Sequence, residues 1–213
     1  MKAYLKTNAV LIVWELLFVA SCFLLPEKYT VYTNLMFYIG ILLYFIIVGR
    51  FSCDFFKKWG ENLSSGKKFW GNVLLTILFL VIAYASTMLL EGVFPMLDTG
   101  TINLKSNGWA GVAIFVVSTI ALPPIAEELF FREGMIKFGN AKVLVATTLL
   151  SMFLYSLEHS LTPWGILLTM IWAVPFSVFY IKTKNIYVTM TAHLITNLVF
   201  NGIDTAMMIA SML

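Results

Sequence analysis

Seven long apolar runs constrain the fold of this chain more than any other feature of its sequence. A helix needs roughly 17 to 25 apolar residues to cross the hydrocarbon core of a bilayer, and the runs approach or exceed that length. Hydrophobic residues make up 60% of the chain and charged residues 12%, which is more apolar sequence than a soluble domain can bury. We therefore predict an all-α, polytopic membrane helix bundle with about seven transmembrane helices. The predicted spans are Asn8–Leu25, Val31–Val48, Trp70–Leu90, Trp109–Phe138, Val143–Leu157, Trp164–Ile181 and Ile186 to about Ile203.

These spans predict a single transmembrane domain over residues 1–213, with the polar motifs in a core of about residues 109–203. Pro123-Pro124 interrupts the fourth run, and we expect a helix to restart after it. Residues 204–213 are apolar but short. The sequence leaves open whether they extend the seventh helix or lie at the membrane interface.

The basic residues predict the orientation of the bundle, because cytoplasmic loops are enriched in Lys and Arg. With the N-terminus in the cytoplasm, 12 of the 14 Lys and Arg residues fall on the inner side, and only Lys28 and Lys105 fall outside. The net charge of +3 reflects these loops and gives no reason to expect a nucleic-acid partner. The inner residues are Lys2, Lys6, Arg50, Lys57, Lys58, Lys67, Lys68, Arg132, Lys137, Lys142, Lys182 and Lys184.

The linker between the second and third spans carries an aromatic stripe. Phe51, Phe55 and Trp59 repeat at i, i+4 and i+8 with charged residues between them. This spacing predicts an amphipathic helix that lies in the headgroup region with its apolar face toward the membrane.

Three polar motifs lie inside the apolar spans and indicate an active site within the membrane. Ionisable side chains cost roughly 2.5 to 3.5 kcal/mol each on insertion scales, so membrane proteins usually keep them for function. The chain has only two histidines, and each stands four residues from another polar or aromatic group. The motifs are Glu127-Glu128-Leu-Phe-Phe-Arg132, Tyr155-Ser-Leu-Glu-His159 and His193-Leu-Ile-Thr-Asn197.

The paired glutamates have different expected environments. Glu128 and Arg132 are i and i+4, so they share a helix face and can neutralise each other. Glu127 points about 100° away, between Phe130 and Phe131, with no local counter-charge. It is therefore our candidate for a general base. The alternative is that both glutamates form an ion-paired helix end, which stays open for Glu128 and Arg132.

Helix arithmetic tests whether the histidines can meet Glu127. From the nearest predicted inner turns, Glu127 lies about 18 Å, His159 about 29 Å and His193 about 12 Å along their helices. These depths permit the three groups to converge. Asn197 shares a face with His193, so the two can point hydrogen-bond donors at one developing oxyanion. The alternatives are that the histidines and Tyr155 only pack, and that Asn197 only joins neighbouring helices.

The order and spacing of these motifs resemble the CPBP family of intramembrane proteases, also called Abi or CAAX-protease-like, which includes the Ras-converting prenyl-protein endoprotease. The resemblance covers roughly Ala121 to Asn201. It implies an all-helical peptidase in which Glu127 is the general base, His159 positions the attacking water, and His193 and Asn197 form the oxyanion site. Glu128, Arg132 and Tyr155 would support that site. The chain departs from the family pattern in having Tyr155 where Phe is usual and Glu133 directly after Arg132.

We therefore predict an integral membrane endopeptidase, of the bacterial cell membrane, with its active site opening to the cytoplasm. Its partners would be membrane lipids and a membrane-associated peptide, as in bacteriocin or signal-peptide processing and immunity. One alternative is an inactive relative that confers immunity by sequestering a peptide. Another is a small proton-coupled transporter that uses Glu15, Glu127 and the histidines.

The sequence leaves a zinc cofactor open, because Glu127, His159 and His193 are all possible ligands. We favour a water held by Glu127 and His159 without a metal. The reason is that we expect Glu128 to pair with Arg132, and His193 to act with Asn197 as a donor.

Overall fold

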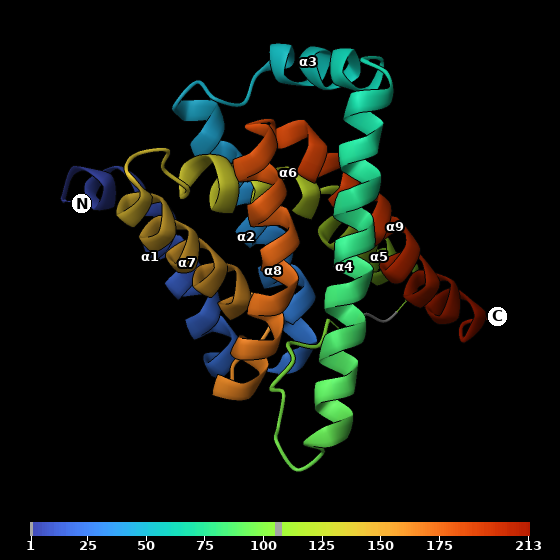
Figure 1. The fold of residues 1–213 in the computed structure, drawn as a ribbon. Coiled ribbons are helices and arrows are strands. Elements are labelled where there is room, and N and C mark those ends of the chain that lie inside the picture. The colour runs from blue at the N-terminus through green and yellow to red at the C-terminus, as the bar shows by residue number, and fades with distance from the viewer. Residues whose placement is uncertain (1, 105–107) are drawn as a thin grey trace.

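A computed structural model describes residues 2–104 and 108–213, with side chains described from Asn8 onward. Within these residues the chain is helical, and the helices form a bundle that α3 caps at one end (Figure 1). The elements are α1 (Lys2–Leu24), η1 (Glu27–Tyr29), α2 (Thr30–Ile47), α3 (Cys53–Leu63), α4 (Lys67–Val93), α5 (Gly108–Val116), η2 (Val117–Ala121), α6 (Pro123–Glu127), η3 (Glu128–Gly134), α7 (Ala141–Leu157), α8 (Pro163–Thr183) and α9 (Ile186–Ala210).

The membrane prediction is confirmed in part, because five helical stretches are long and apolar enough to span a bilayer. The first and fifth predicted spans correspond to shorter apolar helices, Asn8–Leu24 and Ala141–Leu157. The count of seven is therefore not confirmed by length. Large apolar side chains such as Ile47 and Leu89 face outward, 83% and 72% exposed, as expected for a surface in contact with lipid. The five stretches are Glu27–Ile47, Lys67–Val93, Gly108–Gly134, Pro163–Thr183 and Ile186–Ala210.

The fourth span is continuous but irregular, because prolines stand in its middle. Pro123 and Pro124 have no N–H to donate, and the turn before them widens into the π-helical η2, where the Leu122 N–H reaches Val117 O at 3.0 Å. A second π-helical stretch, η3, follows α6 directly. The helix thus starts again at Pro123 without leaving the span. The wide turns place Glu127 and Glu128 at the junction between α6 and η3, and π-helical turns are frequent at functional sites.

The seventh span is longer than we expected. α9 continues to Ala210, so residues 204–210 extend this helix rather than forming a separate element.

One end of the bundle carries α3 and most of the basic residues. The aromatic stripe of α3 packs on the start of α9: Phe55 lies 5.2 Å from Tyr187 between ring centroids, and Trp59 Nε1 donates to Thr191 Oγ1 at 2.9 Å. The apolar face of this linker therefore contacts protein, where we had expected the headgroup region. Of the residues used to predict orientation, Lys105 and the side chains of Lys2 and Lys6 lie outside the described residues.

At the opposite end, the segment before α5 lies against the connection between α7 and α8. The Ile102 N–H donates to His159 O and the Leu161 N–H donates to Gly100 O, each at 3.0 Å. Gly165 permits this close approach, because a Cβ there would lie 1.7 Å from Thr99 O. The backbone around His159 is thereby fixed to the segment before α5.

Candidate active site

A cavity of about 650 Å³ lies inside the bundle and collects most of the predicted site residues. It is walled by α2, α4, the Thr101–Leu104 segment, the fourth span, α7, α8 and α9. The predicted residues that line it are Glu127, Tyr155, His159, His193 and Asn197. Three helices separated by long stretches of sequence thus bring their polar motifs to one space.

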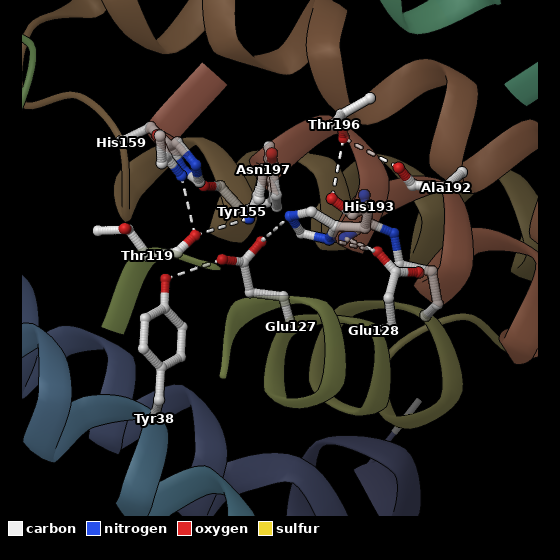
Figure 2. Close-up of polar contacts among 12 residues, drawn as sticks. Tyr38, Thr119, Glu127, Glu128, Tyr155, His159, Ala192, His193, Thr196 and Asn197 are labelled. Atoms are coloured by element: carbon white, nitrogen blue, oxygen red, sulfur yellow. Dashed lines mark hydrogen bonds and ion pairs between the residues drawn. The ribbon is translucent and has the colours of Figure 1, made fainter. Parts of the chain in front are cut away.

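Glu127 is the last residue of α6 and is 1% exposed. Its Oε1 atom accepts a hydrogen bond from the Tyr38 hydroxyl at 2.8 Å (Figure 2). Its Oε2 atom has no hydrogen-bond partner among the described residues and lies 3.8 Å from His193 Nε2. One carboxylate oxygen is therefore held by a hydrogen bond, and the other can still accept one.

Glu128 and Arg132 form the predicted i, i+4 pair, with 3.6 Å between Oε1 and Nη1, and both side chains are fully buried. That distance is too long for a hydrogen bond, and aromatic rings complete the guanidinium environment. The Arg132 Cζ atom lies 4.8 Å from the centroid of Tyr155 and 4.9 Å from that of Phe176. The pair belongs to the protein interior rather than to a solvated helix end.

His193 lies between the two glutamates, and this differs from our expectation. Its Nδ1 atom is 3.3 Å from Glu128 Oε1, and its Nε2 atom faces Glu127 (Figure 2). We had expected His193 to act together with Asn197, one helical turn away. The fourth span packs against the start of α9, and this packing places the carboxylates of Glu127 and Glu128 beside the imidazole. Since a carboxylate oxygen only accepts, the Nδ1 atom carries a proton in this contact.

The Asn197 amide is directed to the backbone of η2. Its Nδ2 atom donates to Thr119 O at 2.9 Å, and Asn201 donates to the same carbonyl at 2.8 Å. Asn197 therefore joins helices, as one of the two sequence readings allowed. It also lines the cavity, and an amide nitrogen has a second N–H to offer there.

The tautomer of His159 follows from its contact with Tyr155. The His159 Nδ1 atom lies 3.0 Å from Tyr155 O, and because a carbonyl only accepts, Nδ1 is the donor. In the neutral ring Nε2 is then an acceptor. The Tyr155 ring stacks on the imidazole with 4.5 Å between centroids, so Tyr155 fixes both the position and the tautomer of His159.

The ligand set that the sequence left open for zinc, Glu127, His159 and His193, does not come together as a metal site. Among the described residues, no group of three or more His, Cys, Asp or Glu side chains is arranged to hold a metal ion. The Nδ1 atoms of both histidines are already directed to oxygen atoms of the protein. We derive no step through a metal.

The motif-bearing part of the chain matches a family model. Residues 108–199 match the family model described as Rce1-like, type II CAAX prenyl endopeptidase. These residues belong to the CAAX-protease-like family. No curated protein and no solved structure matches the chain. The match supports a protease at the level of the family, and the matched residues contain all three polar motifs.

Sequence reasoning missed Tyr38, a cavity residue outside the three polar motifs. Tyr38 comes from α2, 89 residues before Glu127, and its side chain is 4% exposed. The only sequence signal was a tyrosine inside an apolar run. Glu15, which the transporter alternative would use, is fully buried, and neither of its carboxylate oxygens has a hydrogen-bond partner among the described residues.

The cavity lies toward the end of the bundle opposite α3. Its wall includes Thr101–Leu104 and, in the C-terminal part of α9, Asp204 and Met208. No described lysine or arginine is among the residues that line it. The predicted opening of the site toward the cytoplasm stays a prediction.

Proposed function

We propose that this protein is an intramembrane endopeptidase that hydrolyses a peptide bond in a membrane-associated peptide or protein, with Glu127 as the general base. The observation that carries the proposal is that Glu127 lines the cavity and that its Oε2 atom accepts no hydrogen bond from the described residues. A general base needs a proton-accepting atom within reach of the substrate, held in a fixed position. Tyr38 fixes the other oxygen.

In this proposal a water in the cavity gives a proton to Glu127 Oε2 while its oxygen attacks the carbonyl carbon of the scissile bond. His159 accepts a hydrogen bond from the second hydrogen of the water through Nε2, which its tautomer leaves as an acceptor, and this hydrogen stays on the attacking oxygen. The tetrahedral intermediate then collapses, the carbon–nitrogen bond breaks, and the leaving nitrogen takes the proton from Glu127.

The oxyanion of the intermediate needs donors that point into the cavity. The second N–H of Asn197 supplies one. His193 supplies another only when Nε2 carries a proton, since Nδ1–H is directed to Glu128. Glu128 and Arg132 act as positioning residues, because Glu128 contacts His193 Nδ1 and Arg132 pairs with Glu128.

The substrate class that we propose is a bacterial membrane peptide that is processed, such as a bacteriocin or a signalling peptide. Support comes from the size of the cavity and from the family match, which concerns proteins that cleave peptides. The cavity is large enough for several residues of an extended peptide.

Mass spectrometry of candidate peptides tests the proposal. Purified protein in detergent is incubated with membrane-associated peptides, in parallel with its Glu127→Ala variant. We expect new peptide termini with the parent protein and none with the variant. Binding of a peptide without cleavage by the parent would instead favour immunity by sequestration.

A further inference from the structure

The wall of the cavity carries a second carboxylate that the proposed mechanism does not use. Glu158 is the C-cap residue of α7, next to His159, and it lines the cavity. Its side chain is only 5% exposed, and neither carboxylate oxygen has a hydrogen-bond partner among the described residues. A buried carboxylate without a donor or a counter-charge is strongly disfavoured.

The neighbouring groups do not satisfy this carboxylate. The Tyr38 hydroxyl approaches both Glu127 and Glu158, but it has a single proton, which it donates to Glu127. Arg132 is the buried cation of this region, and it is paired with Glu128. Glu158 therefore needs either a proton of its own or a cationic group that arrives with a ligand.

The charge of the cavity also favours a cationic group. Three residues of its wall carry carboxyl groups, namely Glu127, Glu158 and Asp204, and no lysine or arginine is among the described residues that line it. Across the described chain, four glutamates and one arginine are buried. A site of low dielectric constant with an excess of carboxylates attracts positive charge.

We propose that Glu158 forms a subsite for a positively charged group of the substrate, the ammonium of a lysine or the guanidinium of an arginine near the scissile bond. This inference rests on the proposed protease function and adds a substrate class to it. Two free oxygens in a buried position match the several N–H donors of either cation, and charge-assisted hydrogen bonds are the strong ones.

A set of paired probe peptides tests this subsite. Each is an apolar octapeptide of leucine and alanine, fluorescently labelled, acetylated at its N-terminus and amidated at its C-terminus, so that it has no terminal charge. A single position carries lysine, arginine or norleucine, and that position is moved along the peptide. Binding to the purified protein is measured by fluorescence anisotropy, with empty micelles as the reference for partitioning.

At one position we expect lysine and arginine to bind roughly 10- to 100-fold more tightly than norleucine, the range of a charge-assisted hydrogen bond. In Glu158→Gln the preference for lysine and arginine over norleucine should be lost or reversed, because norleucine suits an uncharged apolar subsite better. A second set of norleucine peptides keeps a free N-terminal amine. Tight binding of this set would show that the subsite takes a peptide terminus, and weak binding would show that it takes a side chain.

Asp204→Asn is the matched control, because it removes the same charge from an exposed residue at the cavity wall. It should keep the lysine preference. The inference is overturned if norleucine binds as well as lysine at every position of the parent protein, or if the preference survives in Glu158→Gln. The parent comparison needs no variant, so a folding defect cannot obscure it.

Cleavage of the same peptides separates this inference from the function on which it rests. Peptides that bind with a lysine preference but stay intact would count against the protease and leave the subsite standing. Peptides that are cleaved without regard to charge would support the protease and refute the subsite.

Discussion

The Tyr38 hydroxyl donates to Glu127 Oε1 at 2.8 Å, and this contact holds the proposed base from a helix that lies outside the family match. It is a buried hydrogen bond between side chains of α2 and α6. The N-terminal half of the chain is therefore part of the site and not only its enclosure.

Tyr38→Phe should keep the fold and lower the rate of cleavage by about 10-fold or more, since a hydrogen bond to a charged group contributes roughly 1.5 to 3 kcal/mol. Tyr32→Phe on the same helix is the control, because Tyr32 is 46% exposed. Cleavage rates and thermal unfolding of both variants provide the measurement. Equal rates for the two would show that Tyr38 does not position the base.

Glu127→Gln should keep the shape of the site and lose roughly 10² to 10⁴ in rate, the usual contribution of a positioned base. The glutamine oxygen still accepts the Tyr38 hydroxyl, so the yield of folded protein should not change. His159→Ala should be comparably damaging. If these variants express normally and still cleave like the parent, the mechanism based on Glu127 is wrong.

The first effect of Glu128→Gln should be a lower yield of folded protein rather than a slower reaction. It leaves Arg132 buried without its ion pair, and breaking such a pair costs about 3 to 5 kcal/mol. We expect a lower yield of monodisperse protein in size-exclusion chromatography. The double variant with Arg132→Met should recover part of that yield, because no charge is then left unpaired. A double variant as poor as the single one would argue against this account.

Asn197→Ala should reduce turnover by about 10² to 10³ with little effect on substrate binding, because an oxyanion exists only during the reaction. Asn201→Ala is its natural comparison, since both amides donate to Thr119 O. Steady-state kinetics should show a large loss of kcat for Asn197 alone. Similar losses for both variants would indicate that the amides serve only to join helices.

The orientation of the bundle can be tested with single cysteines in a variant that lacks Cys22 and Cys53. Lys67→Cys probes the end that carries α3, and Met96→Cys probes the other end, where Met96 is 93% exposed. With the N-terminus in the cytoplasm, an impermeant maleimide on intact cells should label Met96→Cys and leave Lys67→Cys unlabelled. The reverse pattern would invert the predicted topology.

Contacts between residues four positions apart could be predicted from sequence because they depend on local helical geometry. The Glu128–Arg132 pair is four residues apart, and the contact between Tyr155 and His159 has the same spacing. The general convergence of the motifs was also predictable from helix lengths, and all three reach one cavity.

Contacts between helices were not predictable, since they depend on how each helix is rotated and tilted. Tyr38 meets Glu127 across 89 residues, and no local pattern marks that pair. His193 is close to both glutamates because the fourth span packs against α9. The depth estimate for His159 assumed upright helices, whereas α7 runs obliquely to α4 in Figure 1.

The carbonyl of Thr119 has two amide donors where one would suffice. The two amides lie one helical turn apart on α9, so this helix is joined to η2 at two neighbouring points. If one amide is removed, the carbonyl oxygen keeps the other donor, and no buried acceptor is left without a partner. A single substitution at either asparagine should therefore leave the junction between α9 and η2 intact.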